Sequence, residues 1–392
     1  LPESTEMLGL VFDLAQHFLQ LHDDDWYRDE GLPKRYFELI TNTVGGAPDK
    51  AAAYFRQLQD DLTSEEQTQH RRAEEKLEFA LDFLHSGQLA YFLPEVLCAV
   101  AKRVCLKDPS EARRRGRDGH ELYEHEAQLG LRHFGSQNFF PAGSLQGPFR
   151  YLLHYHFPYG LRLVIDMANA AASFLALAAP NEVERVAPDQ SPNGHEHIHS
   201  SMLWLAYRGI SVTADTLASA LMALEERLLQ AAGAGQRISS SLEALIAEGT
   251  SSLTTSVVAS IVTAYPNQVS ARLLSLLRHP GFFLADKSRM TQERSSLAVL
   301  AGSDLLSKMR QDERIASNKL PHRQEDLETL VLRLQLQGSP LTSDIHAILD
   351  THTARLHADP ELAGNDAWRM ALKRMDARGL RLGAPVGDGA YQ

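Results

Sequence analysis

The sequence predicts an all-α protein, built either as an irregular α-solenoid of HEAT-like helix pairs or as a non-repeating multi-helix bundle. Apolar residues recur at steps of three and four along most of the chain, which is the period of one buried helix face. Sustained alternation of apolar and polar residues is absent, and so is an Asn-Gly hairpin signal, so no strands are expected. Proline ends several of the predicted helices early, which favours short antiparallel pairs.

Residues 1–110 are predicted to form an N-terminal helical domain. Thr63-Ser64-Glu65-Glu66 fits a capping box and predicts a helix start. A later helix from Leu93 to Leu106 carries Cys98 and Cys105 two turns apart, too far for a disulfide. Neither cysteine lies in a CxxC pair, so we interpret both as small buried hydrophobes in a reducing cytoplasm. The first helix has one apolar stripe, formed by Leu8, Val11, Phe12, Ala15, Phe18 and Leu19.

Residues 111–190 are predicted to be a helical region with a basic linker and an aromatic/His turn. The formal net charge of −11 makes nucleic acid an unlikely partner, so the basic cluster is expected to be a solvated linker. The aromatic/His turn, Tyr151 to Tyr159, predicts a packing seam between two helices, with a ligand pocket that uses His154 and His156 as the alternative. The stretch from Leu161 to Pro180 is apolar, but the polar residues inside it indicate a buried helix and no membrane span. The basic cluster consists of Arg113, Arg114, Arg115 and Arg117.

Residues 191–392 are predicted to form a helical-repeat region with a Gly-rich tail from Gly379. The polar stretch from Ala179 to Gly194 before it is expected to be a linker. Within the region, one helix is predicted to break at Tyr265-Pro266-Asn267, and a second helix to continue through Val269 to Leu277.

The sharpest motif that bears on chemistry is His195-Glu196-His197-Ile198-His199, which matches HExxH. In zinc hydrolases the two histidines of this motif bind Zn²⁺ from one helix face, and Glu225 or Glu226 would be the third ligand here. The preceding Asn193 gives another explanation, because as an N-cap it would place Glu196 at N3 of a surface helix. We favour this explanation, so no catalytic, cofactor or metal residue is assigned from the motif.

A second histidine arrangement is less specific. His346, Asp350 and His357 would share one face of a helix, and a His–Asp pair can orient an imidazole for base catalysis. Nothing nearby supplies a nucleophile, so exposed helix-surface residues are the simpler interpretation. A P-loop, a GxGxxG fingerprint and a GxSxG elbow are all absent from the sequence.

Two segments carry a resemblance to a known family. Phe139 to Phe174 and Thr254 to Phe283 resemble helical regions of large bacterial signal-transducing ATP-binding proteins (STAND-type NTPases) of anti-phage defence. The resemblance implies a helical array that senses a trigger or packs subunits together, while the ATPase residues themselves are not on this chain. We therefore predict a cytoplasmic scaffold or sensor that binds a protein partner or self-assembles without cofactor or membrane, with the zinc-dependent hydrolase at 195–199 as the alternative.

Overall fold

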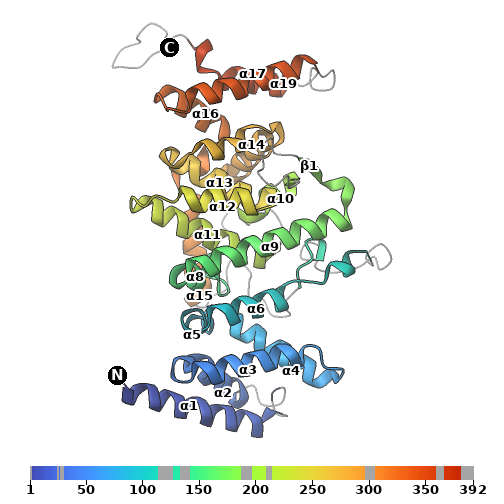
Figure 1. The fold of residues 1–392 in the computed structure, drawn as a ribbon, viewed down its shortest axis with the longest axis vertical. Coiled ribbons are helices and arrows are strands. Elements are labelled where there is room, and N and C mark those ends of the chain that lie inside the picture. The colour runs from blue at the N-terminus through green and yellow to red at the C-terminus, as the bar shows by residue number, and fades with distance from the viewer. Residues whose placement is uncertain are drawn as a thin grey trace. The chain divides into compact units, whose positions relative to one another are not determined.

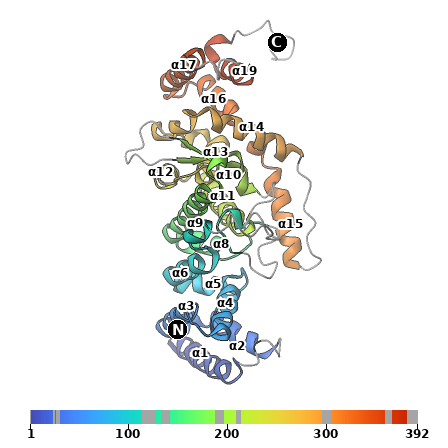
Figure 2. The same ribbon diagram turned by 90° about the vertical axis from the view of Figure 1, so that its right-hand side faces the viewer.

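The computed structural model describes residues 2–23, 26, 31–113, 127–132, 142–186, 197–208, 214–295, 305–358 and 366–380. Over these residues the protein is all-α, as predicted, with helices joined by short turns and one two-stranded sheet (Figure 1 and, turned by 90°, Figure 2). The chain divides into two compact units. Unit 1 comprises Leu1–Val183, Ala206–Gln230 and Ala298–Ile315, and unit 2 comprises Glu184–Leu205, Ala231–Leu297 and Ala316–Gln392. The three consecutive regions 1–110, 111–190 and 191–392 stay a prediction beside this division into two units.

The first part of unit 1 is a series of short helices, several of which begin at a proline. Pro33, Pro48 and Pro94 lie in the first turns of α2, α3 and α6, where the missing N–H costs no hydrogen bond. Helix α4 begins at Gln67 with Glu66 as its N-cap, three residues after the predicted cap Thr63, and no side chain caps it. The elements are α1 (Pro2–Leu21), α2 (Leu32–Asn42), η2 (Val44–Gly46), α3 (Pro48–Asp61), α4 (Gln67–Leu81), α5 (Ser86–Phe92), α6 (Pro94–Cys105) and η3 (Pro109–Arg113).

The rest of unit 1 is centred on α9 (Phe157–Ala178), which follows α8 (Phe149–Tyr155) after a break at His156. By length and composition alone α9 could cross a membrane, but more than half of its apolar window is buried, and it packs on α6 and α8. Its Asp166 accepts a hydrogen bond from Lys102 at 3.1 Å, so this charge is paired within the unit. The remaining elements are η4 (Pro180–Glu182), η5 (Ala206–Arg208), and most of α11 (Asp215–Gly233) and α15 (Leu305–Asn318).

Unit 2 is organised around α13 (Ser252–Ala264), which packs against α10, α12 and α16 and is buried on nearly every side. The helix predicted over Val269–Leu277 is a 3-10 helix, η7 (Ala271–Leu277). Its buried leucines recur every three residues, which suits three residues per turn. The other elements are β1 (Glu184–Val186), β2 (His197–His199), α10 (Ser201–Leu205), α12 (Ser239–Glu248), η6 (Pro266–Gln268), α14 (Pro280–Ser295), η8 (Pro321–Gln324), α16 (Leu327–Leu336), α17 (Thr342–Ala358), α19 (Asp366–Met375) and η9 (Ala377–Gly379).

A buried network of charges ties three elements of unit 2 together. Arg289 of α14 donates to Asp286 at 2.7 Å and to Glu293 at 2.5 Å, and Arg323 of η8 donates to Glu293 at 3.2 Å. Asp286 also accepts the backbone N–H of Leu327 at 2.9 Å, at the start of α16. All four charged side chains are nearly inaccessible to solvent, so each depends on its partners for compensation of its charge.

Several predicted features fall in or beside segments outside the described residues. Arg113 is the last residue of η3, while Arg114, Arg115 and Arg117 lie outside, as does the tail beyond Leu380. The linker predicted over 179–194 is wrong at its start, where η4 and β1 form, and residues 187–194 are not described.

Candidate functional site

The HEHIH motif does not form the helix predicted for it. Residues His197–His199 form β2, which pairs antiparallel with β1 so that Glu184 lies opposite His199. The Ile198 N–H donates to the Thr250 carbonyl at 2.8 Å, which fixes the strand against the start of α13. A three-residue strand is too short to show alternation of apolar and polar residues, so this strand could not be predicted from the sequence. The surface helix predicted to begin after Asn193 is therefore wrong at His197–His199, while Asn193, His195 and Glu196 lie outside the described residues.

His197 and His199 are two residues apart on one strand, so both point to the same face, toward α13. Both are buried. The Thr255 hydroxyl donates to the Ser251 carbonyl at 3.1 Å, which leaves its oxygen to accept the Nε2–H of His197 at 3.0 Å. His199 Nδ1 lies 2.6 Å from the Ser252 hydroxyl. Burial lowers the pKa of both histidines to about 4, so both are neutral at pH 7.

Two further groups lie beside His199, and neither was expected from the sequence. His279 lies just before α14, with its ring centroid 5.6 Å from that of His199. Its Nε2 is 3.3 Å from an Oε1 of Glu184, on β1. One ligand atom each from Glu184, His199 and His279 lies within 4.8 Å of the others, so these three side chains could hold a metal ion.

The histidine cluster, formed by His197, His199 and His279, is bordered by aromatic rings and by a cavity. The Phe282 ring lies 5.1 Å from that of His199 and stacks on Trp204 at 5.3 Å. A cavity of about 80 Å³, large enough for two or three waters, borders the cluster. Its polar lining consists of His197, Thr255, Ser275, Arg278, His279 and Arg355.

The other residues considered as ligands or catalytic groups have structural partners. Glu225 accepts a hydrogen bond from the Tyr207 hydroxyl at 2.7 Å, and Glu226 pairs with Arg150 at 3.0 Å, all within unit 1. Neither carboxylate joins the histidine cluster of unit 2.

The predicted His346–Asp350 pair is likewise divided between other partners. His346 Nε2 is 3.1 Å from the side-chain oxygen of Gln335, and Asp350 accepts two hydrogen bonds from Arg378. His357 is exposed. The shared helix face exists, because all three residues lie on α17, but the arrangement does not orient an imidazole for base catalysis.

In unit 1 the aromatic/His turn lies at the end of α8 and forms part of a surface hollow, not a closed seam. The hollow, about 480 Å³, is lined by residues of α2, α5 and α8 and of the segment before α5. Tyr91 and Tyr155 meet edge to face at 5.2 Å, and Tyr151 stacks on Phe83 at 4.8 Å. The His156 ring accompanies them, with Nε2 2.8 Å from the Tyr91 carbonyl. We call this feature the aromatic hollow; its lining residues are Asn42, Leu84, Gly87, Gln88, Tyr91, Phe92, Tyr151 and Tyr155.

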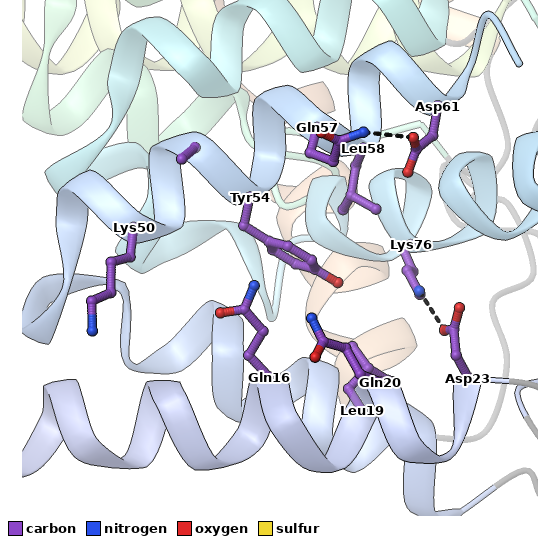
Figure 3. A pocket seen from close by; sticks show the side chains of 11 residues that line it. Gln16, Leu19, Gln20, Asp23, Lys50, Tyr54, Gln57, Leu58, Asp61 and Lys76 are labelled. Carbon is purple, nitrogen blue, oxygen red and sulfur yellow. Dashed lines mark hydrogen bonds and ion pairs between the residues drawn. The ribbon is translucent and has the colours of Figure 1, made fainter.

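A second hollow of unit 1, about 510 Å³, lies where α1, α3 and α4 meet (Figure 3). Lys76 of α4 donates to Asp23 at 2.5 Å, and Gln57 donates to Asp61 at 2.9 Å, so its polar groups pair with one another. Tyr54 projects into it from α3, and burial raises the pKa of its hydroxyl above the usual value. These pairings are typical of a solvated groove between helices. The residues that line it do not place a nucleophile in contact with a base, so the groove is not a candidate active site.

The two cysteines are free thiols buried on α6, as predicted. Burial raises the pKa of Cys98 to about 11 and also raises that of Cys105, so neither is a reactive thiolate at neutral pH.

Comparison with models of known protein families gives no match, and comparison with curated protein sequences gives none either.

Proposed function

We propose that this chain is a helical recognition module that binds a protein partner through the aromatic hollow of unit 1. The observation that carries the proposal is the exposure of large apolar side chains around that hollow. Tyr91 is 53% exposed, Phe92 41% and Tyr155 44%, although a folded chain normally buries such side chains. Leu84, 62% exposed, continues the same patch. An apolar patch of this kind is typical of an interaction site.

The geometry of the hollow suits recognition of a protein. Tyrosine offers a large, stiff contact area with a polar hydroxyl, and tyrosines are enriched at interfaces for that reason. The ring–ring contacts of Tyr91 with Tyr155 and of Tyr151 with Phe83 hold these side chains in place before a partner arrives. Binding would therefore cost little side-chain entropy.

A second exposed apolar surface supports self-assembly or a further contact. Helix α1 presents Met7, Leu10, Leu14 and Leu21 to solvent, 66%, 60%, 47% and 63% exposed. Their spacing places them on one face of the helix. This solvent-facing face is apolar, whereas the solvent-facing side of an ordinary surface helix is polar. A helical scaffold with two such faces can hold two partners or two copies of itself.

From the resemblance to STAND-type NTPases we propose further that this module belongs to a larger bacterial defence protein of the cytoplasm, in which a helical array follows the ATP-binding module. Under this proposal, the trigger of the defence response or a neighbouring subunit occupies the aromatic hollow. Two sequence segments carry this resemblance. Phe139 to Phe174 overlaps α8 and α9, and Thr254 to Phe283 overlaps α13 and α14.

The test is site-specific photo-crosslinking in cells that produce the full chain. A photoreactive phenylalanine analogue replaces Tyr155, and in a matched control it replaces Leu177, which is 43% exposed on α9 of the same unit. We expect a discrete crosslinked species from position 155 and none from 177. Tyr91→Ser should reduce its yield about tenfold, as for loss of an interface hot spot. A monomeric chain that gives no species at 155 above the level at 177 would contradict the proposal.

A further inference from the structure

We propose that Glu184, His199 and His279 of unit 2 form a mononuclear binding site for a divalent transition-metal ion, Zn²⁺ above all. Two imidazoles and one carboxylate are a donor set that zinc proteins use when a fourth position stays open. The three ligand atoms lie within 4.8 Å of one another and come from three different segments, β1, β2 and the start of α14. This proposal is independent of the recognition function. Its ligands also differ from those of an HExxH site, in which His195 and His199 would bind the metal together.

The first supporting feature is the free nitrogen of a buried histidine. His199 is 6% exposed, its Nδ1 is bonded to Ser252, and its Nε2 has no hydrogen-bond partner among the described residues. A metal on Nε2 requires the proton on Nδ1, and the Ser252 oxygen at 2.6 Å is placed to accept it. Such a partner, which fixes tautomer and ring orientation, accompanies almost every metal-binding histidine.

The second feature is a space kept open by a glycine. A Cβ added to Gly281 would lie 2.8 Å from Nε2 of His199 and 2.9 Å from Nδ1 of His279, closer than real side-chain contacts. That Nδ1 is buried and has no hydrogen-bond partner in the described part of the chain. Gly281 therefore leaves room beside both imidazole rings, and the Nε2 of His279, which faces Glu184, is the nitrogen that this ring offers to the metal.

The third feature is the freedom of the carboxylate to complete the site. Donors in a tetrahedral zinc site lie about 3.4 Å apart, from metal–donor bonds of about 2.1 Å. The ligand atoms of this cluster lie within 4.8 Å of one another, so they need to close by at most about 1.4 Å to reach that spacing. Glu184 has a long side chain that is 60% exposed and already lies 3.3 Å from His279, so it can make the adjustment without disturbing the core.

Charge around the site predicts what would occupy the fourth position. The neighbouring cavity of about 80 Å³ contains Arg278 and Arg355 in its lining, both cationic. A small anion or a hydroxide in that cavity would be attracted by the metal and by both guanidinium groups. We therefore expect the fourth ligand to be a small oxyanion or a metal-bound water.

The experiment measures Zn²⁺ binding by the purified full chain after removal of metal with a chelator. Zn²⁺ is titrated against a chromophoric indicator, and Co²⁺ is used separately for its visible absorption in low-symmetry sites. We expect one tight equivalent per chain. Glu184→Gln and His279→Gln should weaken binding by at least the 10–100-fold seen for outer-shell partners, and Ser252→Ala by about that amount.

Two matched controls separate this site from the alternatives. His195→Gln should leave binding unchanged, whereas an HExxH site would lose its metal. His357→Gln on the exposed part of α17 tests for adventitious surface binding and should also have no effect. Glu184→Gln changes an exposed side chain, so the fold is expected to persist, and far-UV circular dichroism checks it. Absence of a tight equivalent, or tight binding that is insensitive to both Glu184→Gln and His279→Gln, would overturn the proposal.

Discussion

The two units of this chain bury ionisable groups in opposite ways. Unit 1 holds half-buried carboxyl groups that form no ion pair with a described residue: burial, together with acidic neighbours, raises the pKa of both Glu78 and Glu313 to about 7. Unit 2 buries complete charge networks, in which Arg289 lies between Asp286 and Glu293. It also buries neutral histidines such as His352, whose pKa burial lowers. Unit 1 is therefore held by helix-on-helix apolar contact around α9, whereas unit 2 relies on polar groups that must all be satisfied together.

The difference should appear first in the effect of removing one charge from unit 2. Arg289→Met leaves Asp286 and Glu293 buried without their main partner, so we expect the free energy of unfolding of unit 2 to fall by about 3–5 kcal/mol. Arg272→Met removes an arginine whose side chain is 80% exposed and whose partner is Glu243, and should cost about 0–1 kcal/mol. Hydrogen exchange followed by mass spectrometry reports each unit separately. A small, equal loss for both variants would show that the network does not stabilise unit 2.

Unit 1 should respond most to loss of apolar packing on α9. Leu175→Ala empties a fully buried position, and we expect a loss of about 3 kcal/mol from the transfer of the side chain and the cavity left behind. Leu177→Ala on the same helix is the matched control, because that side chain is 43% exposed, and it should change stability by less than about 0.5 kcal/mol. Denaturant unfolding of both variants gives the comparison directly. Equal effects would mean that α9 is not the centre of a packed core.

The sequence was sufficient for the parts of the fold that depend on local period. The apolar stripes and prolines predict α6 to within one residue at each end, the end of α13 at Ala264, and α9 apart from its first turn, because a helix of that length leaves a 3.6-residue signature in its own sequence. The sequence was not sufficient for β1 and β2, because each strand is only three residues long and pairs with the other across residues 187–196.

The candidate site was predicted only in part, for the same reason. His199 was identified from its motif, but its neighbours Glu184 and His279 come from other elements and share no spacing with it. The one available signal was Gly281 two residues after His279, and the Pro280-Gly281 pair is also typical of an ordinary turn. Tertiary contact, not local sequence, decides which histidines meet.

The units should also respond to pH in opposite directions. A carboxyl whose folded pKa is raised binds a proton more tightly when folded, so its contribution to stability is present below about pH 4.5 and is lost as the pH rises through about 7. A histidine whose folded pKa is lowered, such as His352, binds a proton more weakly when folded, so its unit loses stability as the pH falls below about 6.5. Unit 1 should therefore weaken between pH 5 and 8, by roughly 1–2 kcal/mol after allowance for partial exposure.

Substitutions separate these two effects. Glu78→Gln with Glu313→Gln should remove the alkaline weakening of unit 1 and leave unit 2 unchanged. His352→Gln should remove part of the acid weakening of unit 2 and leave unit 1 unchanged. Hydrogen exchange, corrected for the intrinsic rate at each pH, gives the measurement. A parallel response of both units in the wild type would contradict the comparison.

The smallest expected effect concerns a single helix cap in unit 2. Asp326 precedes α16 and its side chain accepts the Thr329 N–H at 2.9 Å, while Lys287 donates to its other oxygen at 2.9 Å. Asp326→Asn keeps an acceptor for the Thr329 N–H but loses the negative charge, whereas Asp326→Ala loses both. We expect a loss of about 1–2 kcal/mol for the alanine variant and a smaller loss for asparagine. Thermal unfolding of the two variants separates capping from ion pairing. Because Lys287 is partly exposed, its ion pair with Asp326 should contribute less to stability than the cap does. Equal losses for the asparagine and alanine variants would instead assign the stabilisation to the negative charge of Asp326. Unit 2 would then depend on paired charge even where the cationic partner, Lys287, is partly exposed, which would strengthen its contrast with unit 1.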